Sequence, residues 1–264
     1  MNPPIYIISR GRADYSGHFG HYLNKIGVPY SVVIEEDEHD AYTQTFGADR
    51  LLVLDQSYKT SYNYCDDRDP RGSGPARNWV WDHAESQGHD WYWLFDDNIK
   101  ALQRRFANAD RRLAGPEWFE PFHSVASQVR NVGMTGPIYY TFRPFTSVMP
   151  PISIAHLMSG FLIRTELGIR WECRYNEDID LSIRMAKSGW LPVRLNNLLI
   201  HKAATQSVPG GNTSDLYTYG TSAKTSQLVA RHPQYVKATK RYGRPHHQID
   251  WPGLIADYNL AYVT

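Results

Sequence analysis

The chain has 264 residues, of which 42% are apolar and 21% charged, a balance that predicts a packed globule and excludes a disordered polymer. Its formal net charge is only +1, so any contact with a polyanion must come from a local patch. Two cysteines exclude a cysteine zinc site and a framework of disulfides, and no apolar run suits a membrane span or a signal peptide, so we expect a protein of the reducing cytoplasm.

Strand and helix patterns alternate through the first half of the chain. Short β-rich runs predict strands, and the segments between them have the length of helices. We expect, in order, a strand at 4–9, a helix at 13–27, a strand at 30–36, a helix at 38–47 and a strand at 50–55. Alternating units of this size predict an α/β fold with a parallel sheet and helices on its faces.

A long segment rich in Tyr, Ser, Gly and Asp, residues 56–74, interrupts this alternation. Loops of such length inside compact domains are usually functional or mobile. A helix is predicted at 75–88, with Pro75 in its first turn and Gly88 at its end. The next run, "DWYWLF" (90–95), is apolar on both faces, as a central parallel strand is.

The second half of the chain is less regular. We expect an amphipathic segment at 116–133, a strand at 154–164, a helix at 176–189, a strand at 190–202 and a flexible loop, "SVPGGNTS", at 207–214. Because no linker is visible, we expect a single domain, 1–264, with two functional halves, 1–98 and 99–264.

Two adjacent carboxylates and an amide, Asp96, Asp97 and Asn98, directly follow the most apolar predicted strand. In open α/β sheets, ligands bind at the carboxyl ends of strands. Oxygen ligands suit Mg²⁺ or Mn²⁺, which also bridge the oxygens of a diphosphate. The alternative is the N-cap of a helix formed by "NIKALQRRF", but a cap needs only one carboxylate. We therefore favour a cation site.

A second acidic group, Asp66, Asp67 and Asp69, lies in the long loop beside Arg68 and Arg71. No buried strand fixes this group, so we expect a solvated loop whose charges neutralise one another.

The run "NEDID" (176–180) opens a predicted helix. Asn176 can cap that helix, and Glu177 and Asp178 fit the positive end of its dipole, so a structural role is the simplest explanation. A carboxylate at a helix start that faces a cleft can also accept a proton from a hydroxyl group. His201 follows the apolar run "LNNLLI"; a lone histidine is more often structural, yet at a strand end it could complete a Mn²⁺-type site.

The order of these segments resembles that of the GT-A-fold nucleotide-sugar glycosyltransferases. The resemblance covers residues 4–202 and is carried by "PIYIISRGR", "SVVIEED", "GPARNWVWDHA", "YWLFDDN", "SGFLIR", "NEDIDLSIR" and "LLIHK". The triplet Asp-Asp-Asn is similar to the Asp-x-Asp metal motif of that fold, with Asn in the last place. The resemblance implies a Rossmann-like, mostly parallel sheet, a UDP-sugar donor and a Mn²⁺ or Mg²⁺ ion.

The resemblance also implies a role for each matched residue. The nucleotide sugar would be bound by Ser9, Arg10, Arg12, Glu35 or Glu36, Arg77 and Asp96. The metal would be held by Asp97, Asp96 and His201. Asp178 would be the catalytic base, with Glu177 beside it, and the 207–214 loop would close over the donor.

A narrower resemblance is to the phage TET/JBP-associated glycosyltransferases, which are thought to glycosylate 5-hydroxymethylpyrimidines in DNA. It rests on "IYIISRGRADYSGHFGHYL", on "RNWVWDHA" with "WYWLFDDNI", and on "VARHPQYVKATKRYGRPHHQIDW". It implies 5-hydroxymethylcytosine DNA as acceptor and, for a phage protein, the host cytoplasm. Duplex phosphates would meet Arg231, Lys237, Lys240, Arg241 and Arg244, with Arg104, Arg105, Arg111 and Arg112 as a second patch. An ordinary solvated helix face explains these basic residues equally well.

A DNA acceptor would require the modified base to leave the stack. Stacking surfaces for it could come from Tyr62, Tyr64, Trp118, Tyr139 and Tyr140. Three alternatives stay open: the same chemistry on a glycan, lipid or protein, a non-catalytic nucleic-acid-binding module on a degenerate transferase scaffold, and a metal-dependent nucleotidyltransferase.

Overall fold

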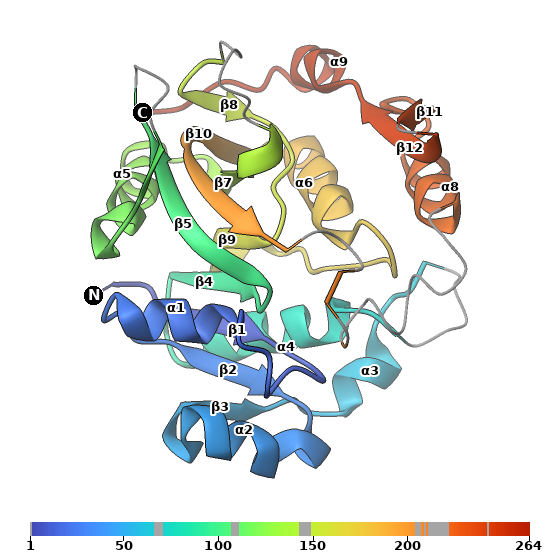
Figure 1. The fold of residues 1–264 in the computed structure, drawn as a ribbon. Coiled ribbons are helices and arrows are strands. Elements are labelled where there is room, and N and C mark those ends of the chain that lie inside the picture. The colour runs from blue at the N-terminus through green and yellow to red at the C-terminus, as the bar shows by residue number, and fades with distance from the viewer. Residues whose placement is uncertain are drawn as a thin grey trace.

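Strands and helices alternate in the first half of the chain, in the predicted order (Figure 1). The computed structural model describes residues 2–65, 71–106, 111–142, 149–203, 207–208, 210, 222–241 and 243–264. The elements of the first half are β1 (Ile5–Ile8), α1 (Phe19–Lys25), β2 (Ser31–Ile34), α2 (His39–Phe46), β3 (Leu51–Val53), α3 (Ser57–Ser61), α4 (Gly74–Ser86) and β4 (Trp91–Asp96). The short helix α3 lies within the segment that we predicted as a loop.

The second half contains both further strands of the large sheet and a separate hairpin. Its elements are β5 (Ile99–Arg105), β6 (Arg111–Leu113), α5 (Glu120–Gln128), β7 (Val132–Tyr139), β8 (Ile152–Ile154), β9 (Gly160–Arg164), α6 (Glu177–Lys187), β10 (Leu191–Lys202), α8 (Ser222–Arg231), β11 (Val236–Arg241), β12 (Arg244–Ile249) and α9 (Trp251–Asp257). Single 3₁₀ turns lie at Glu36–Glu38, Ala48–Arg50, Pro116–Phe119, Tyr140–Phe142 and Thr165–Leu167. The strand predicted at 154–164 is thus two strands, β8 and β9.

The large sheet has the strand order β3-β2-β1-β4-β9-β7-β10-β5-β6 among the described residues, with β8 paired to β10. The strands β3, β2, β1 and β4 are parallel, and β7 is parallel to β10. The strands β9, β5 and β8 run antiparallel to their neighbours. Most strands therefore share one direction, which confirms the predicted α/β class with a mostly parallel central sheet.

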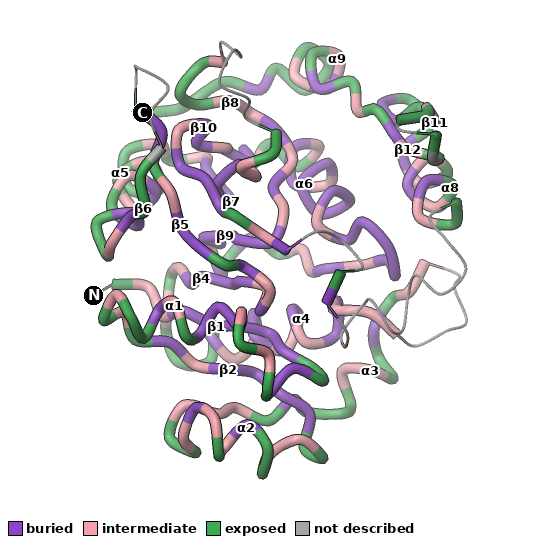
Figure 2. Tube along the Cα trace, viewed as in Figure 1, coloured by how far each residue is buried: buried purple, intermediate pink, exposed green. Residues whose placement is uncertain are grey.

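Strand β4 is buried along most of its length (Figure 2), and it contributes side chains to apolar cores on both faces of the sheet. Trp93 and Phe95 pack in one core with α1, α2 and α5, whereas Tyr92 and Leu94 pack in the other with α4. All four side chains are fully buried. Burial of each such side chain stabilises the fold by roughly 1.5–3 kcal/mol, which explains why a strand this apolar occupies the middle of the sheet.

The residues that follow Asp96 and Asp97 form a strand, not the helix that these carboxylates could have capped. Strand β5 pairs antiparallel with β10, and Leu102 lies opposite Ile200. Pairing with a strand a hundred residues later overrides the helix propensity of the local sequence. The cap alternative for the two carboxylates is therefore wrong.

The N-terminal helix α1 begins at Phe19 rather than at residue 13. The ring Nδ1 of His18 accepts a hydrogen bond from the backbone N–H of Gly20 and caps the helix. The backbone N–H of Phe19 donates to the carbonyl of Asp97 at 2.8 Å. Residues 9–18 thus form a loop that runs beside the end of β4.

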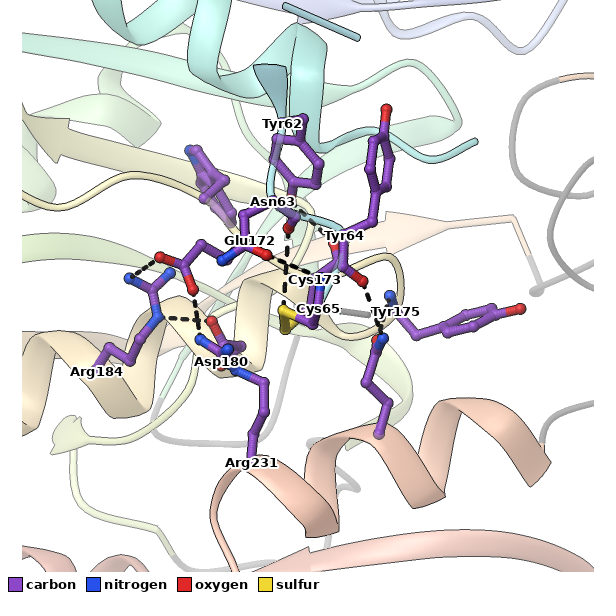
Figure 3. Close-up of a disulfide and its surroundings, with 12 residues drawn as sticks. Tyr62, Asn63, Tyr64, Cys65, Glu172, Cys173, Tyr175, Asp180, Arg184 and Arg231 are labelled. Atoms are coloured by element: carbon purple, nitrogen blue, oxygen red, sulfur yellow. Dashed lines mark hydrogen bonds and ion pairs between the residues drawn. A yellow bond between two sulfur atoms is a disulfide. The ribbon is translucent and has the colours of Figure 1, made fainter. Parts of the chain in front are cut away.

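A disulfide joins Cys65, after α3, to Cys173, before α6 (Figure 3). The sequence alone favoured two reduced cysteines, because a single pair far apart in the chain carries no local signal of its pairing. The backbone N–H of Cys173 donates to the carbonyl of Asn63, and the hydroxyl of Tyr62 donates to the carbonyl of Cys173, both at 2.9 Å. Among the described residues, no helix combines the length and the apolar character that crossing a membrane requires.

Candidate active site

A pocket of about 770 Å³ lies at the carboxyl ends of β1, β2 and β4. One side of the pocket is formed by Ser9, Glu35 and Asp97, which follow those three strands, and we call it the donor side. The beginnings of α4 and α6 and the end of β10 complete this side, and the β11–β12 hairpin lines the other. The paired strands explain the convergence, because Ile8 lies beside Asp96 in the register of β1 and β4.

Asp97 is a buried anchor for the loop that follows β1. Its Oδ2 accepts a hydrogen bond from Ser9 Oγ at 2.8 Å, and its Oδ1 accepts one from Arg12 Nη1. Burial raises the pKa of Asp97, and Arg12 and Ser9 oppose that rise. Nη2 of Arg12 donates to the carbonyl of Gly210 at 2.9 Å, so one guanidinium connects β4 to the 207–214 loop.

Asp96 lies between two cations. Its Oδ1 accepts from Arg77 Nη2 at 2.9 Å, and its Oδ2 accepts from Lys202 Nζ at 2.7 Å. The Lys202 ammonium also donates to Ser159 Oγ at 2.6 Å. Burial alone would raise the pKa of Asp96, but Lys202 and Arg77 hold it below its ordinary value. This carboxylate is therefore ionised and neutralised by protein groups.

Arg77 is a buried guanidinium with hydrogen-bonding capacity to spare. It lies over the rings of Phe161 and Trp171, with 5.1 and 4.7 Å between its central carbon and the ring centroids. Its Nε lies 3.5 Å from Glu177 Oε1. Its buried Nη1 has no hydrogen-bond partner among the described residues. Since buried donors are nearly always satisfied, this nitrogen is suited to an anionic ligand.

Glu177 and Asp178 open helix α6 at the same pocket. Glu177 Oε1 accepts a hydrogen bond from Ser73 Oγ at 2.5 Å. Burial, followed by the neighbouring Glu177 carboxylate, raises the pKa of Asp178 to about 6. Asn176 stands at the cap position with φ of 52°, but its side chain donates to the carbonyl of Lys224 and makes no capping hydrogen bond with the described backbone. The capping role expected for Asn176 is wrong.

Of the two acidic candidates after β2, the structure brings only Glu35 to the pocket. Glu35 is buried and accepts from Lys59 Nζ at 2.6 Å and from Gln56 Nε2 at 2.8 Å. Arg10 lies with its Nε 4.0 Å from the same carboxylate and lines the pocket. Glu36 is exposed and does not line it.

The described residues do not fit the predicted metal centre. Asp96 and Asp97 already contact cations or hydroxyl donors through both oxygens. His201 is exposed, with its ring 5.3 Å from that of Tyr140, and it is not a lining residue. A bulge between His201 and Lys202 lies at this point, and Lys202 is the residue that lines the pocket. In the parts of the chain described, no three His, Cys, Asp or Glu side chains gather in a metal-binding group.

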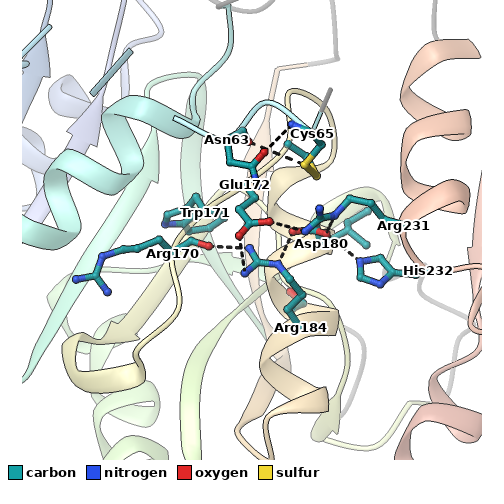
Figure 4. Close-up of polar contacts among 12 residues, drawn as sticks. Asn63, Cys65, Arg170, Trp171, Glu172, Asp180, Arg184, Arg231 and His232 are labelled. Carbon is teal, nitrogen blue, oxygen red and sulfur yellow. Dashed lines mark hydrogen bonds and ion pairs between the residues drawn. A yellow bond between two sulfur atoms is a disulfide. The ribbon is translucent and has the colours of Figure 1, made fainter. Parts of the chain in front are cut away.

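The basic residues expected to contact DNA do not form one surface. Arg231 Nε donates to Asp180 Oδ1 at 2.7 Å and its Nη2 to Glu172 Oε2 at 2.6 Å (Figure 4). Asp180 is fully buried and is also contacted by Arg184 and His232, so Arg231 belongs to a structural ion network. The sequence did not predict this ion network, because the network depends on how α8 packs against α6.

The other predicted DNA contacts lie on two hairpins. Lys237, Lys240 and Arg241 are exposed on β11, and Arg241 lines the pocket. Arg244 lies opposite Arg241 in β12, but its side chain is outside the described part. On the β5–β6 hairpin Arg104 and Arg112 are exposed and Arg105 is buried, and the side chain of Arg111 is outside the description. This second patch lies on strands, not on the helix face considered for it.

Of the five stacking candidates, only Tyr139 lines the pocket. Trp118 is buried in the core and donates from its indole Nε1 to the carbonyl of Gln103. Residues 66–69 lie outside the described residues, as does most of the 207–214 loop. The polar lining residues that sequence reasoning missed include Lys202, Ser159, His156, Arg194 and His247. Lys202, Ser159 and His247 carried a signal, since each lies in a segment quoted for the resemblance.

The model of the TET-associated glycosyltransferase family matches residues 3–211. The chain belongs to this family. It is therefore a glycosyltransferase, as the sequence predicted. No curated protein matches the chain.

Among solved structures, this TET-associated glycosyltransferase is similar to the glucosyl-3-phosphoglycerate synthase of Mycobacterium tuberculosis, crystallised in complex with Mg²⁺ and uridine diphosphate. The TM-score is 0.53 at 11% sequence identity, and the similarity covers 94% of this chain and 87% of that chain. At such low identity the similarity shows the fold alone, and it confirms the predicted GT-A architecture.

Proposed function

We propose that this glycosyltransferase moves a sugar from a UDP-sugar to the hydroxyl of 5-hydroxymethylcytosine, or another 5-hydroxymethylpyrimidine, in phage DNA. The observation that carries the donor part is Arg77, a buried guanidinium in the pocket whose Nη1 has no partner among the described residues. The family and the UDP-bound neighbour support a nucleotide-sugar donor.

The donor occupies the donor side of the pocket, where residues 1–98 are joined by the beginning of α6 and the end of β10. In this proposal Glu35 accepts a hydrogen bond from the uracil edge, and Ser9, Arg10 and Arg12 border the nucleotide. All four residues line the pocket. Asp96 contacts the ribose or holds the cations in position. The acceptor meets the half formed by 99–264, which includes the β11–β12 hairpin.

Departure of the diphosphate is helped by the cations around Asp96. Arg77 and Lys202 present positive charge where the leaving group gains negative charge, and such preorganised donors are among the largest contributions to catalysis. The resemblance implies Mn²⁺ or Mg²⁺ for this role, and the neighbour binds Mg²⁺. Because the described residues do not fit that ion, we assign it no step and give the charge stabilisation to Arg77 and Lys202.

Attack on the anomeric carbon requires a base, and we assign that role to Asp178, which lines the pocket. A carboxylate with a pKa raised to about 6 is still ionised at neutral pH and binds a proton more readily than an ordinary aspartate. Such a base contributes on the order of a hundred- to ten-thousandfold to the rate. Glu177, held by Ser73 and Arg77, positions the acceptor or the donor sugar beside it.

Incubation with a panel of nucleotide sugars tests the proposal, with 5-hydroxymethylcytosine DNA and unmodified DNA side by side. Mass analysis of the nucleosides should show a hexose or pentose added only to the hydroxymethylated base, and only with a UDP-sugar. Hydrolysis of a UDP-sugar without transfer to either DNA would refute the DNA acceptor and favour a glycan, lipid or protein. Binding of DNA without any donor turnover would mean a non-catalytic module.

A further inference from the structure

We infer that the hairpin side of the pocket is an oxyanion subsite, built by Arg194, His156 and His247, which binds a phosphodiester of the acceptor strand. The inference rests on the proposed DNA acceptor and names the group by which the pocket holds that strand. It is carried by an arginine that contacts no carboxylate and by a buried histidine nitrogen that has no hydrogen-bond partner, both within the described part of the chain.

Arg194, on β10, differs from the buried arginines on the donor side of the pocket. Arg12 and Arg77 each contact a carboxylate, whereas the hydrogen bond of Arg194 runs from Nε to the side-chain oxygen of Asn196 at 2.9 Å. No carboxylate of the described residues contacts it. Burial lowers the pKa of Arg194 to about 10, so it still carries its charge at neutral pH. A largely buried charge without a counterion is costly, and an anionic ligand would offset that cost.

Two histidines lie with Arg194 in the pocket lining. His247, on β12, is buried, and its Nδ1 has no hydrogen-bond partner among the described residues. Burial, then Lys224, His246 and Arg241, lowers the pKa of His247 to about 4. The imidazole is therefore neutral and provides one N–H donor and one acceptor.

His156 is the second of these histidines and is fixed by the helix that follows the hairpin. Its Nδ1 accepts a hydrogen bond from the indole N–H of Trp251 at 3.1 Å. The remaining ring nitrogen, Nε2, therefore carries the proton of the neutral imidazole and is a donor. Burial, then Arg194 and His247, lowers the pKa of His156 to about 3, and all three residues line the same pocket.

The lining carboxylates lie on the donor side of the pocket, and they include Asp178 at the start of α6. Asp96, Asp97, Glu35 and Glu177 lie on the donor side, each beside a cation or a hydroxyl. The hairpin side presents Arg194, Lys224, Arg241 and histidines. One arginine with neutral N–H donors suits a singly charged oxyanion, such as a phosphodiester, better than the doubly charged end of a nucleoside diphosphate.

The hairpin connects this subsite with the outer surface. In the register of β11 and β12, Lys237 and Arg241 lie on the face that carries His246 and Gln248, whereas Lys240 lies on the face of His247. Of the basic residues on this hairpin, Lys240 is therefore the one that shares the face of His247, and Arg241 also lines the pocket. The family match ends at residue 211, so the hairpin lies outside the matched residues.

The test is binding and transfer with a short oligonucleotide that contains one 5-hydroxymethylcytosine. Binding is followed by fluorescence anisotropy in the presence of UDP, and transfer by mass analysis. One version has methylphosphonates, which lack the negative charge, at the two linkages that flank the modified base. We expect wild-type protein to bind the methylphosphonate version at least about tenfold more weakly, as for a hydrogen bond to a charged group.

Variants identify the residues behind this difference. Arg194→Gln should weaken binding of the ordinary oligonucleotide about tenfold or more and abolish its advantage over the methylphosphonate version. Arg194→Lys should restore part of that advantage. Arg130→Gln, which removes an exposed arginine outside the pocket, should leave both affinities unchanged. If Arg194→Gln does not fold, His247→Asn takes its place, and the wild-type comparison needs no variant.

Several outcomes would overturn the subsite. One is equal binding of both oligonucleotides by wild-type protein, and another is a wild-type preference retained in folded Arg194→Gln. Competition by a small phosphate monoester at the concentration at which the oligonucleotide itself competes would assign the subsite to a free phosphate ester instead. Wild-type transfer to the modified base is scored separately, so its absence would refute the proposed acceptor, while transfer with no phosphate preference would refute the subsite alone.

Discussion

Replacement of Lys202 by glutamine tests the charge stabilisation that the structure gives to this residue. Lys202 Nζ lies 2.7 Å from Asp96 Oδ2 and 2.6 Å from Ser159 Oγ, so its removal leaves Arg77 as the cation that contacts Asp96 among the described residues. The loss of one donor aimed at a developing anion costs about 2.7–4 kcal/mol, or about 10²–10³ in kcat. Affinity for UDP should fall about 10- to 100-fold as well, because a charge-assisted hydrogen bond contributes about 1.5–3 kcal/mol.

The assay is hydrolysis of the UDP-sugar, together with calorimetric titration of UDP, each in EDTA and in excess Mg²⁺ or Mn²⁺. Wild-type protein should keep its turnover in EDTA, and neither ion should rescue Lys202→Gln. Lys100→Gln, an exposed lysine on β5, is the matched control and should behave as wild type. Wild-type activity that is lost in EDTA, combined with an active Lys202→Gln, would refute the assignment and return the charge stabilisation to a divalent ion.

Other residues give further tests. Asp178→Asn should lower kcat for transfer at least about a hundredfold while the affinity for UDP is retained, and a smaller loss would limit Asp178 to a structural role at the helix start. Because burial raises the pKa of Asp178 to about 6 and the base acts when deprotonated, kcat should rise with pH through about 6, and a flat profile would contradict this role. Arg231→Ala should lower the free energy of unfolding, measured by urea denaturation, by on the order of 2 kcal/mol. The loss is smaller than for a fully buried pair because Arg184 and His232 still contact Asp180. Reduction of the Cys65–Cys173 disulfide, which spans 108 residues, should lower the melting temperature, since closure of such a loop contributes about 4–5 kcal/mol, and an unchanged melting curve would refute that contribution.

Local patterns predicted the elements that bury a continuous apolar face. The run from Trp91 to Phe95 has large apolar residues at every position, and only a central strand with cores on both faces accommodates them. The carboxyl end of such a strand is a ligand-binding position in any open α/β sheet, so Asp96 and Asp97 could be placed at the pocket before the structure was known. The family resemblance predicted that Arg77, Glu177 and Asp178 belong to the same site.

Features that depend on distant partners could not be predicted. Strand β5 has a helix-like sequence and becomes a strand because β10 pairs with it. His201 and Lys202 are neighbours at the end of the same predicted strand. The sequence does not show that the pairing register shifts between them, or that Lys202 is the residue that contacts Asp96. The sequence predicts Arg231 as an exposed basic residue, and only the structure shows its hydrogen bond to Asp180. His247 lines the pocket because the β11–β12 hairpin forms one side of it.

A crystal structure of the protein with UDP tests the central claim most directly. The account predicts the diphosphate in the pocket at the ends of β1 and β4, with its oxygens within hydrogen-bond distance of Arg77 Nη1 and Lys202 Nζ. A diphosphate bound elsewhere, or one held by a divalent ion on Asp96 and Asp97 with the lysine displaced, would contradict it.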